Sequence, residues 1–315
     1  MNYDKETRPN GVSSLTAEVL AEAMPWIKNC TGKTIVIKYG GAAMVDERLR
    51  ADVMADIVLL KIIGVNPVIV HGGGKAITEA MEQRQLDVRF VEGQRVTTDD
   101  AMEIVRTVLT GKVNQELVAA INAHGNLAVG VSGADAGTII ASQADIRLGR
   151  VGKVERINSQ LLEDLVAGDF IPVLATVGIG EDGGFYNVNA DVVAGHVAAA
   201  IGAHKVVFLT DVDGLYEDFS DKDSLVSRMT LEEAKGLVEG GKLASGMVPK
   251  MRSCVYAMEQ GVHRAHIING TTPHALLLEL LTDKGIGTMI DQEKHADAHD
   301  AKPLGTFASR LAVNN

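Results

Sequence analysis

Two short stretches decide the fold: TIVIKYGG at residues 34–41 and PVIVHGGG at residues 67–74. In each, a short apolar run ends in glycines and a helical pattern follows, over residues 45–63 and from the second glycine cluster to Arg84. Short, fully apolar strands that alternate with helices are typical of a mainly parallel sheet covered on both faces. Ligands of such sheets bind at the carboxyl ends of the strands, where both glycine clusters lie.

The same alternation continues along the chain. We expect helices at 99–109, 113–123, 159–167, 191–202, 231–239, 247–260 and 274–282, and strands at 127–131, 170–175, 206–209 and 265–268. Residues 137–158 alternate with glycines, which predicts short antiparallel strands. The chain is therefore expected to have an α/β fold.

The two ends of the chain differ from this pattern. Residues 14–29 have the periodicity of an amphipathic helix, and Pro25 predicts a kink or a restart within it. We interpret this helix as an arm that precedes the first strand. The polar stretch 293–315 is interpreted as a solvated tail, with metal binding through His295 and His299 as the alternative.

Composition excludes several classes of function. The 315 residues carry a formal net charge of −11, which disfavours nucleic acid and anionic membranes as partners. No apolar run reaches the roughly 18 residues of a membrane span, and the first ten residues do not resemble a signal peptide. We therefore expect a cytoplasmic protein in which Cys30 and Cys254 are reduced thiols.

The glycine clusters are candidate anion sites. Lys38 stands directly before Tyr39, Gly40 and Gly41, and glycine lets backbone N–H groups approach an anion closely while a lysine adds a full charge. Gly72, Gly73 and Gly74 open a helix, whose N-terminal N–H groups also suit an anion. The alternatives are a tight turn with a surface lysine and a flexible turn.

The chain lacks two common nucleotide-binding motifs. Gly74-Lys75 is followed by Ala76, so the stretch is not a Walker A loop. Gly178, Gly180 and Gly183 match GxGxxG, but no helix opens directly after them, which argues against a dinucleotide site.

Four further motifs supply polar side chains. Arg95 lies in a polar loop and suits a carboxylate, and Asn187 and Asp191 open a helix that they could also simply cap. Thr210 and Asp211 end an apolar strand and could face a nucleotide, or form an Asx turn. Lys250 lies in the first turn of a helix, where a cation is disfavoured unless an anion lies beside it.

In their order along the chain, these motifs resemble those of the acetylglutamate kinase branch of the amino acid kinase superfamily, from about residue 33 to residue 290. The resemblance implies a three-layer αβα sandwich with a mainly parallel sheet. It implies a tail and oligomerisation helix over 1–31, an amino-acid-substrate lobe over 32–202, a nucleotide and effector lobe over 203–292, and a polar tail over 293–315.

The resemblance also implies the activity: an ATP-dependent transfer of phosphate to the side-chain carboxylate of N-acetyl-L-glutamate, in arginine biosynthesis. In this scheme Lys38, Lys250 and Asp191 are catalytic. The implied substrate-binding residues are Gly73, Gly74, Arg95 and Asn187, and the implied nucleotide-binding residues are Gly40, Gly41, Thr210 and Asp211. Magnesium would be held mainly by phosphate oxygens and water, so no protein metal ligand is predicted.

By the same resemblance, the N-terminal helix marks a branch that forms homohexamers, as trimers of dimers, and is inhibited by L-arginine. The implied effector residues are Lys205, His274, Glu279 and Gly287. The alternatives are an ordinary helix packed on its own lobe, another superfamily enzyme acting on carbamate, aspartate, glutamate or UMP, and an arginine-sensing protein without catalysis.

Overall fold

A computed structural model of the protein describes residues 12–292, except 45, 219, 242, 245 and 284. Its central sheet has the strand order β12-β14-β13-β11-β1-β2-β8-β5. The strands from β13 to β5 run parallel, whereas β14 is antiparallel to β13 and parallel to β12. The bounds are β1 (Thr34–Tyr39), β2 (Asn66–His71), β5 (Ala128–Ser132), β8 (Ile171–Ala175), β11 (Lys205–Thr210), β12 (Arg228–Thr230), β13 (Arg264–Asn269) and β14 (Thr288–Asp291).

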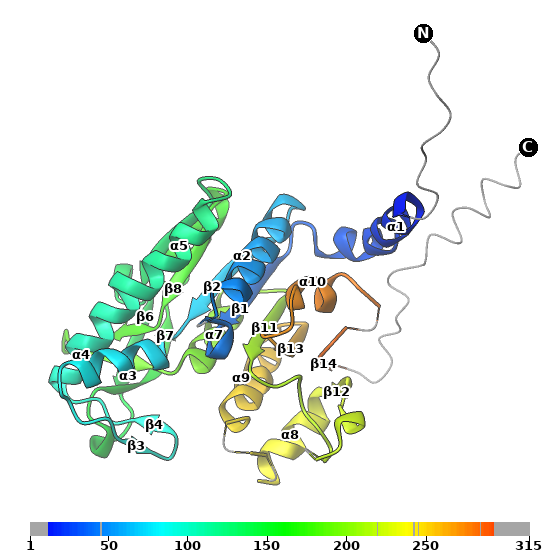
Figure 1. Ribbon diagram of the computed structural model, residues 1–315. Helices are drawn as coiled ribbons and strands as arrows, with labels where there is room; N and C mark the ends of the chain where they lie inside the picture. Colours follow the sequence, from blue (N-terminus) through cyan, green and yellow to red (C-terminus); the bar gives the residue numbers. More distant parts are fainter. Residues whose placement is uncertain are drawn as a thin grey trace, which may run out of the picture.

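Helices cover both faces of this sheet (Figure 1). One face carries α2 (Glu47–Ile62), α3 (Gly74–Gln83), α4 (Asp99–Arg106), the π-helical segment η2 (Thr107–Val113), α5 (Asn114–Asn122) and α10 (Ala275–Leu280); the other carries α6 (Gln160–Ala167), α7 (Ala190–Ala200), α8 (Leu231–Glu239) and α9 (Val248–Glu259). Within β1, Ile35 and Ile37 belong to one apolar core and Val36 to the other, because successive side chains point to opposite faces. The predicted αβα sandwich is confirmed.

Two small strand assemblies accompany the main sheet. β6 (Ile139–Gln143), β7 (Val151–Ile157), β9 (Val177–Ile179) and β10 (Phe185–Val188) close into a small barrel, and β3 (Phe90–Val91) pairs with β4 (Gln94–Arg95). The antiparallel pairing expected in residues 137–158 is present between β6 and β7. The GxGxxG glycines fall in and around the β9–β10 hairpin, which explains why no helix follows them.

One expected helix break is absent. The sequence predicts separate helices over 99–109 and 113–123, but α4, η2 and α5 follow one another without a gap. The bridging turns are π-helical and include Gly111. π-helical insertions in α-helices are frequent at functional sites.

The N-terminal helix α1 (Val12–Cys30) continues through Pro25 and extends away from the sheet (Figure 1). Among the side chains of α1 that the structure describes, those from residue 21 on, the ones in contact with the core lie near its end: Cys30 is buried, and Trp26 and Ile27 pack against the same cluster. Met24 is 58% exposed, which leaves an apolar side chain of the arm uncovered in the monomer. The polar tail 293–315 lies outside the described residues.

Cys30 and Cys254 are both free and buried. Among the helices that the structure describes, none is long and apolar enough to cross a lipid bilayer.

Candidate active site

A cleft of about 1170 Å³ opens at the carboxyl ends of β1, β2 and β11. Of the residues singled out from the sequence, those that line it are Lys38, Gly40, Gly41, Gly73, Gly74, Arg95, Asn187, Asp191 and Asp211. Lys250 is not among the lining residues, but its Nζ lies 3.0 Å from Oδ2 of Asp191, which does line the cleft. Thr210, the last residue of β11, is not among the lining residues.

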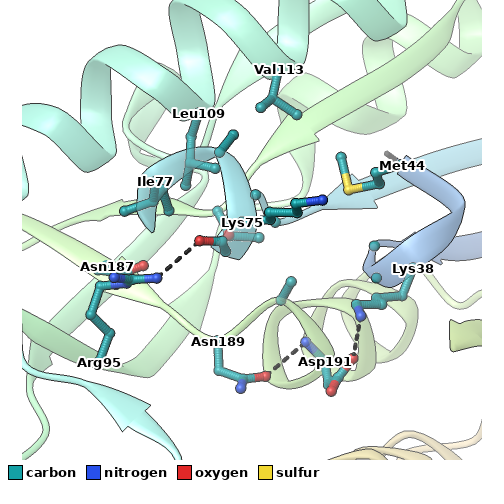
Figure 2. Close-up of a pocket in the computed structure, with 18 of the residues that line it drawn as sticks. Lys38, Met44, Lys75, Ile77, Arg95, Leu109, Val113, Asn187, Asn189 and Asp191 are labelled. Atoms are coloured by element: carbon teal, nitrogen blue, oxygen red, sulfur yellow. Dashed lines mark hydrogen bonds and ion pairs between the residues drawn. The ribbon is translucent and has the colours of Figure 1, made fainter. Parts of the chain in front are cut away.

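Asp191 pairs with two lysines at one end of the cleft, and Figure 2 shows its contact with the first of them, Lys38. Its Oδ1 lies 3.0 Å from Lys38 Nζ, and its Oδ2 lies 3.0 Å from Lys250 Nζ. Three elements supply these groups, since Lys38 is near the end of β1, Asp191 is in the first turn of α7 and Lys250 is in the first turn of α9.

Local sequence fixes the position of Asp191. The side chain of Asn189 caps α7, and its Oδ1 accepts hydrogen bonds from the N–H groups of Asp191, at 2.8 Å, and Val192, at 3.2 Å. Helices α7 and α9 approach closely at Gly195, where a Cβ would lie 2.8 Å from Ser253 O. This close packing brings the start of α9, and with it Lys250, next to Asp191.

The electrostatics of this triad favour a bound anion. Burial opposes ionisation of Asp191, but the two ammonium groups outweigh it and hold the pKa of Asp191 below its ordinary value. Two cations then face one carboxylate, and the lysine side chains are only 11% and 16% exposed. The triad therefore carries one excess positive charge in a position largely shielded from water.

Glycines form the walls between which an anion would lie. Gly41 has φ +74°, and any Cβ there would collide with the carboxylate of Asp211. Gly73 precedes α3, and a Cβ there would lie 2.7 Å from Leu109 Cδ2 and 3.3 Å from Val113 Cγ2. A Cβ at Gly73 would push Leu109 aside, and one at Gly41 would also need a left-handed backbone, so glycine is favoured at both positions and adds no side chain to the cleft.

Arg95 occupies the other end of the cleft, next to Asn187 (Figure 2). It is 7% exposed, and its Nη2 donates to Gly74 O at 2.9 Å and to Thr78 Oγ1 at 2.5 Å. Its guanidinium also lies 4.8 Å from the centre of the Phe90 ring. Burial lowers the pKa of Arg95, and no carboxylate of the described residues pairs with it. A buried guanidinium without a carboxylate partner suits an anionic ligand.

Asn187 is held close to Arg95 by a short chain of hydrogen bonds. Its Nδ2 donates to Thr97 Oγ1 at 3.2 Å, and Thr97 Oγ1 donates to Arg95 O at 3.0 Å. The cleft thus has a lysine-rich end and an arginine–asparagine end, with the glycine-rich loop Gly72–Gly74 between them.

Some lining residues were not singled out from the sequence. Lys75 follows Gly74 directly, and Lys112 lies in the π-helical segment; both line the cleft. The position of Lys75 beside the glycine cluster was a usable signal. Lys112 has no local signal, because an isolated lysine in a helical pattern reads as a solvated surface residue.

The four candidate effector residues lie away from the cleft. Glu279 Oε1 is 2.6 Å from His266 Nδ1, and Glu279 Oε2 accepts hydrogen bonds from the N–H groups of Ile286, at 2.8 Å, and Gly287, at 3.2 Å. Lys205 is buried at the start of β11, and this burial lowers its pKa.

His274 points toward a different element. Its Nδ1 lies 2.7 Å from Asp56 Oδ1 on α2. The structure therefore joins Glu279 and Gly287 directly, whereas the hydrogen bond of His274 connects α10 to the neighbouring helix.

Comparisons with known proteins identify the family of the chain. Residues 33–269 match the family model for the amino acid kinase family. The acetylglutamate kinase of Halothermothrix orenii is 50% identical over 283 residues, which cover 88% of this chain and 98% of that protein. The chain belongs to the acetylglutamate kinase branch of the amino acid kinase family.

Solved structures agree with this membership. The N-acetylglutamate synthase of Neisseria gonorrhoeae, complexed with coenzyme A and N-acetyl-glutamate, superposes with a TM-score of 0.77 at 25% identity, over 94% of this chain and 69% of that one. The same synthase with coenzyme A and L-arginine gives 0.73 at 25% identity, over 88% and 65%. This amino acid kinase family member therefore shares its fold with a synthase solved with N-acetyl-glutamate and with L-arginine.

Proposed function

We propose that the protein transfers the γ-phosphate of ATP to the side-chain carboxylate of N-acetyl-L-glutamate, in arginine biosynthesis. The arrangement of cations carries this proposal. Two lysines that pair with Asp191 lie at one end of the cleft, and Arg95, which pairs with no carboxylate of the described residues, lies at the other. A substrate with a carboxylate at each end would span them. Membership of the acetylglutamate kinase branch supports this choice of substrate.

The chemistry needs few protein groups. The nucleophile is an ionised carboxylate, so no general base is required, and the task is to align the reactants and to stabilise charge on the transferred phosphoryl group. In this mechanism Lys38 and Lys250 contact the phosphoryl oxygens from opposite sides, and Asp191 orients both ammonium groups. The N–H groups of Gly73 and Gly74 hold the reacting end of the acid.

The remaining contacts fix the two substrates. Arg95 takes the second carboxylate of the acid, and Asn187 takes a further polar group. Gly40 and Gly41 lie over the β- and γ-phosphates, while Thr210 and Asp211 lie toward the nucleotide. We assign residues 32–202 to the acid-binding lobe and 203–292 to the nucleotide and effector lobe.

Magnesium fits this cleft as a companion of ATP. Within the described residues no three or more His, Cys, Asp or Glu side chains gather into a metal site. Asp191 is already engaged by two lysines. The ion would therefore be held mainly by phosphate oxygens and water, where it would offset the negative charge of the phosphates.

We further propose that the protein is a cytoplasmic homohexamer inhibited by L-arginine. The arm α1 extends from the body with Met24 exposed, which suits an interface between copies. Glu279 is a buried carboxylate that suits a guanidinium, Gly287 N–H donates to it, and its charge acts on the nearby Lys205. We assign His274, at the start of α10, to the same effector site. The related synthase solved with L-arginine supports this choice of effector.

A coupled assay of ADP release tests the proposed reaction. N-acetyl-L-glutamate, glutamate, aspartate, carbamate and UMP are each offered with Mg-ATP, and hydroxylamine traps any acyl phosphate as a hydroxamate. We expect ADP and hydroxamate to form in equal amounts with N-acetyl-L-glutamate at the highest kcat/KM. Preference for another acceptor would assign the protein to another reaction, and no ADP release with any acceptor would favour a non-catalytic arginine sensor.

A further inference from the structure

His71 is a buried side chain at the edge of the cleft that the proposed mechanism does not use. It is the last residue of β2, it has no exposed surface, and it directly precedes the glycine loop Gly72–Gly74. Its two ring nitrogens both have neighbours: Nδ1 lies 3.0 Å from Gly72 O, and Nε2 lies 3.0 Å from Asn114 Nδ2. Both ring nitrogens are therefore engaged inside the protein rather than by water.

These neighbours determine where the ring proton lies. Asn114 Nδ2 also donates to Val173 O at 2.8 Å, and a carbonyl oxygen can only accept, so the orientation of the Asn114 amide is fixed. An amide N–H₂ group facing Nε2 requires Nε2 to accept. Burial lowers the pKa of His71 to about 4, so the ring is neutral at neutral pH and carries a single proton. That proton is on Nδ1, which donates it to Gly72 O.

The hydrogen bond to Gly72 O sets the direction of the next backbone N–H. In a trans peptide the C=O and N–H groups point in opposite directions. When the carbonyl of Gly72 faces His71, the N–H of Gly73 faces away from it. Within the described part of the chain, neither Gly73 N nor Gly74 N has a backbone acceptor. Both N–H groups remain available to a ligand in the cleft.

The π-helical segment η2 packs against the same loop. Leu109 and Val113 lie so close to Gly73 that a Cβ there would push their side chains aside, and Asn114 is the next residue after the segment. The loop is therefore held by packing on one side and by the His71 hydrogen bond on the other. A glycine loop without such support would lose more conformational freedom on binding a ligand.

We propose that His71 and Asn114 are positioning residues for the transfer reaction: Asn114 fixes the tautomer of His71, and His71 turns the Gly72–Gly73 peptide so that Gly73 N–H faces the reacting oxygen atoms. This inference rests on the proposed phosphoryl transfer. It assigns His71 no contact with substrate, and it assigns the π-helical segment the task of placing Asn114.

Two substitutions at position 71 separate positioning from stability. His71→Leu removes the donor to Gly72 O, whereas His71→Asn retains an N–H group near the position of Nδ1. We expect His71→Leu to lower kcat about 10- to 100-fold, less than the roughly 10²–10³-fold loss of a whole oriented donor, with both KM values changed less than about threefold. His71→Asn should recover most of kcat.

Asn122→Leu is the matched control. Asn122 lies on the same helix as Asn114 and makes three comparable hydrogen bonds, to Leu127 and Ala128, outside the cleft. Its loss should lower the thermal midpoint and leave kcat unchanged. Equal kcat in His71→Leu and the wild type, or equal losses in His71→Leu and His71→Asn, would overturn the proposal.

The tautomer of His71 can also be measured in the wild-type protein, so this test does not depend on whether a variant folds. The ¹⁵N chemical shifts of His71 in the intact protein report its tautomer, and we expect a protonated Nδ1 and a bare Nε2. A protonated Nε2 would contradict the proposal that Asn114 fixes the tautomer of His71. This readout also separates the two claims, because a wild type that phosphorylates no acceptor would refute the proposed function and leave the tautomer result standing.

Discussion

Replacing Asp191 by asparagine tests how much the lysine pair depends on the charge between them. The substitution keeps the size of the side chain and removes one negative charge. At an effective dielectric constant of about 20, two unit charges 3.0 Å apart attract by about 5–6 kcal/mol, and Asp191 makes two such contacts. Part of this attraction is offset by the cost of taking the charges out of water.

The net effect on stability follows from what remains after the substitution. Breaking a buried ion pair costs about 3–5 kcal/mol, because the partner stays buried without its countercharge. We expect the lower end, about 3 kcal/mol, since the two lysine side chains keep 11% and 16% of their surface exposed. For a chain of this size that corresponds to a fall of about 4–5 °C in thermal midpoint. Mg-ATP should raise the midpoint of the variant more than that of the wild type, because phosphate replaces the missing negative charge.

The contribution of Asp191 to the free energy of unfolding depends on pH. The pKa of Asp191 in the folded protein lies below its ordinary value, so the carboxylate stabilises the fold above about pH 4 and this contribution is lost as the pH falls through the folded pKa. The difference in free energy of unfolding between wild type and Asp191→Asn should be constant near neutral pH and shrink in acid.

Asp99→Asn provides the control. Asp99 Oδ1 lies 2.6 Å from Arg150 Nε, but its side chain is 81% exposed, so the same chemical change should cost less than about 1 kcal/mol. If Asp191→Asn were no more destabilising than Asp99→Asn, and if Mg-ATP stabilised both equally, the triad would not be the charged anion site described above.

Two further predictions concern the other parts of the molecule. Arg95→Ala should mainly raise KM for the acid in steady-state kinetics and leave kcat within a few fold, because Arg95 binds a carboxylate that does not react; a fall in kcat at unchanged KM would contradict that role. Removing residues 1–30 should abolish hexamers in analytical ultracentrifugation and weaken arginine inhibition, and unchanged assembly with unchanged inhibition would refute the function assigned to the arm.

The sequence predicts the framework well because its strands are short, apolar and followed by glycines. The strands β1 and β2 and the helices between them have strong periodicity, and tertiary contacts agree with it. The two-residue strands β3 and β4 have no periodicity to detect. The glycine in η2 suggests a helix break, whereas the π-helical geometry lets the chain continue through it.

The site is predictable where a local feature is unusual. Lys250 is conspicuous because a cation in a first helical turn is disfavoured, and the structure supplies the compensating negative charge in Asp191, 59 residues earlier in the chain. The contact between His71 and Asn114 has no comparable signal in the sequence. Asn114 lies in the middle of a helical stretch, and only the packing of η2 against the glycine loop gives it a role.

The most direct test of the lysine pair is the kcat of Lys250→Ala with N-acetyl-L-glutamate and Mg-ATP, measured at saturation of both. Lys250 donates to Asp191 from the first turn of α9 and is assigned to the transferred phosphoryl group. We predict a fall in kcat of roughly 10²–10³-fold. A variant that turns over at the wild-type rate would show that the phosphoryl group is stabilised elsewhere.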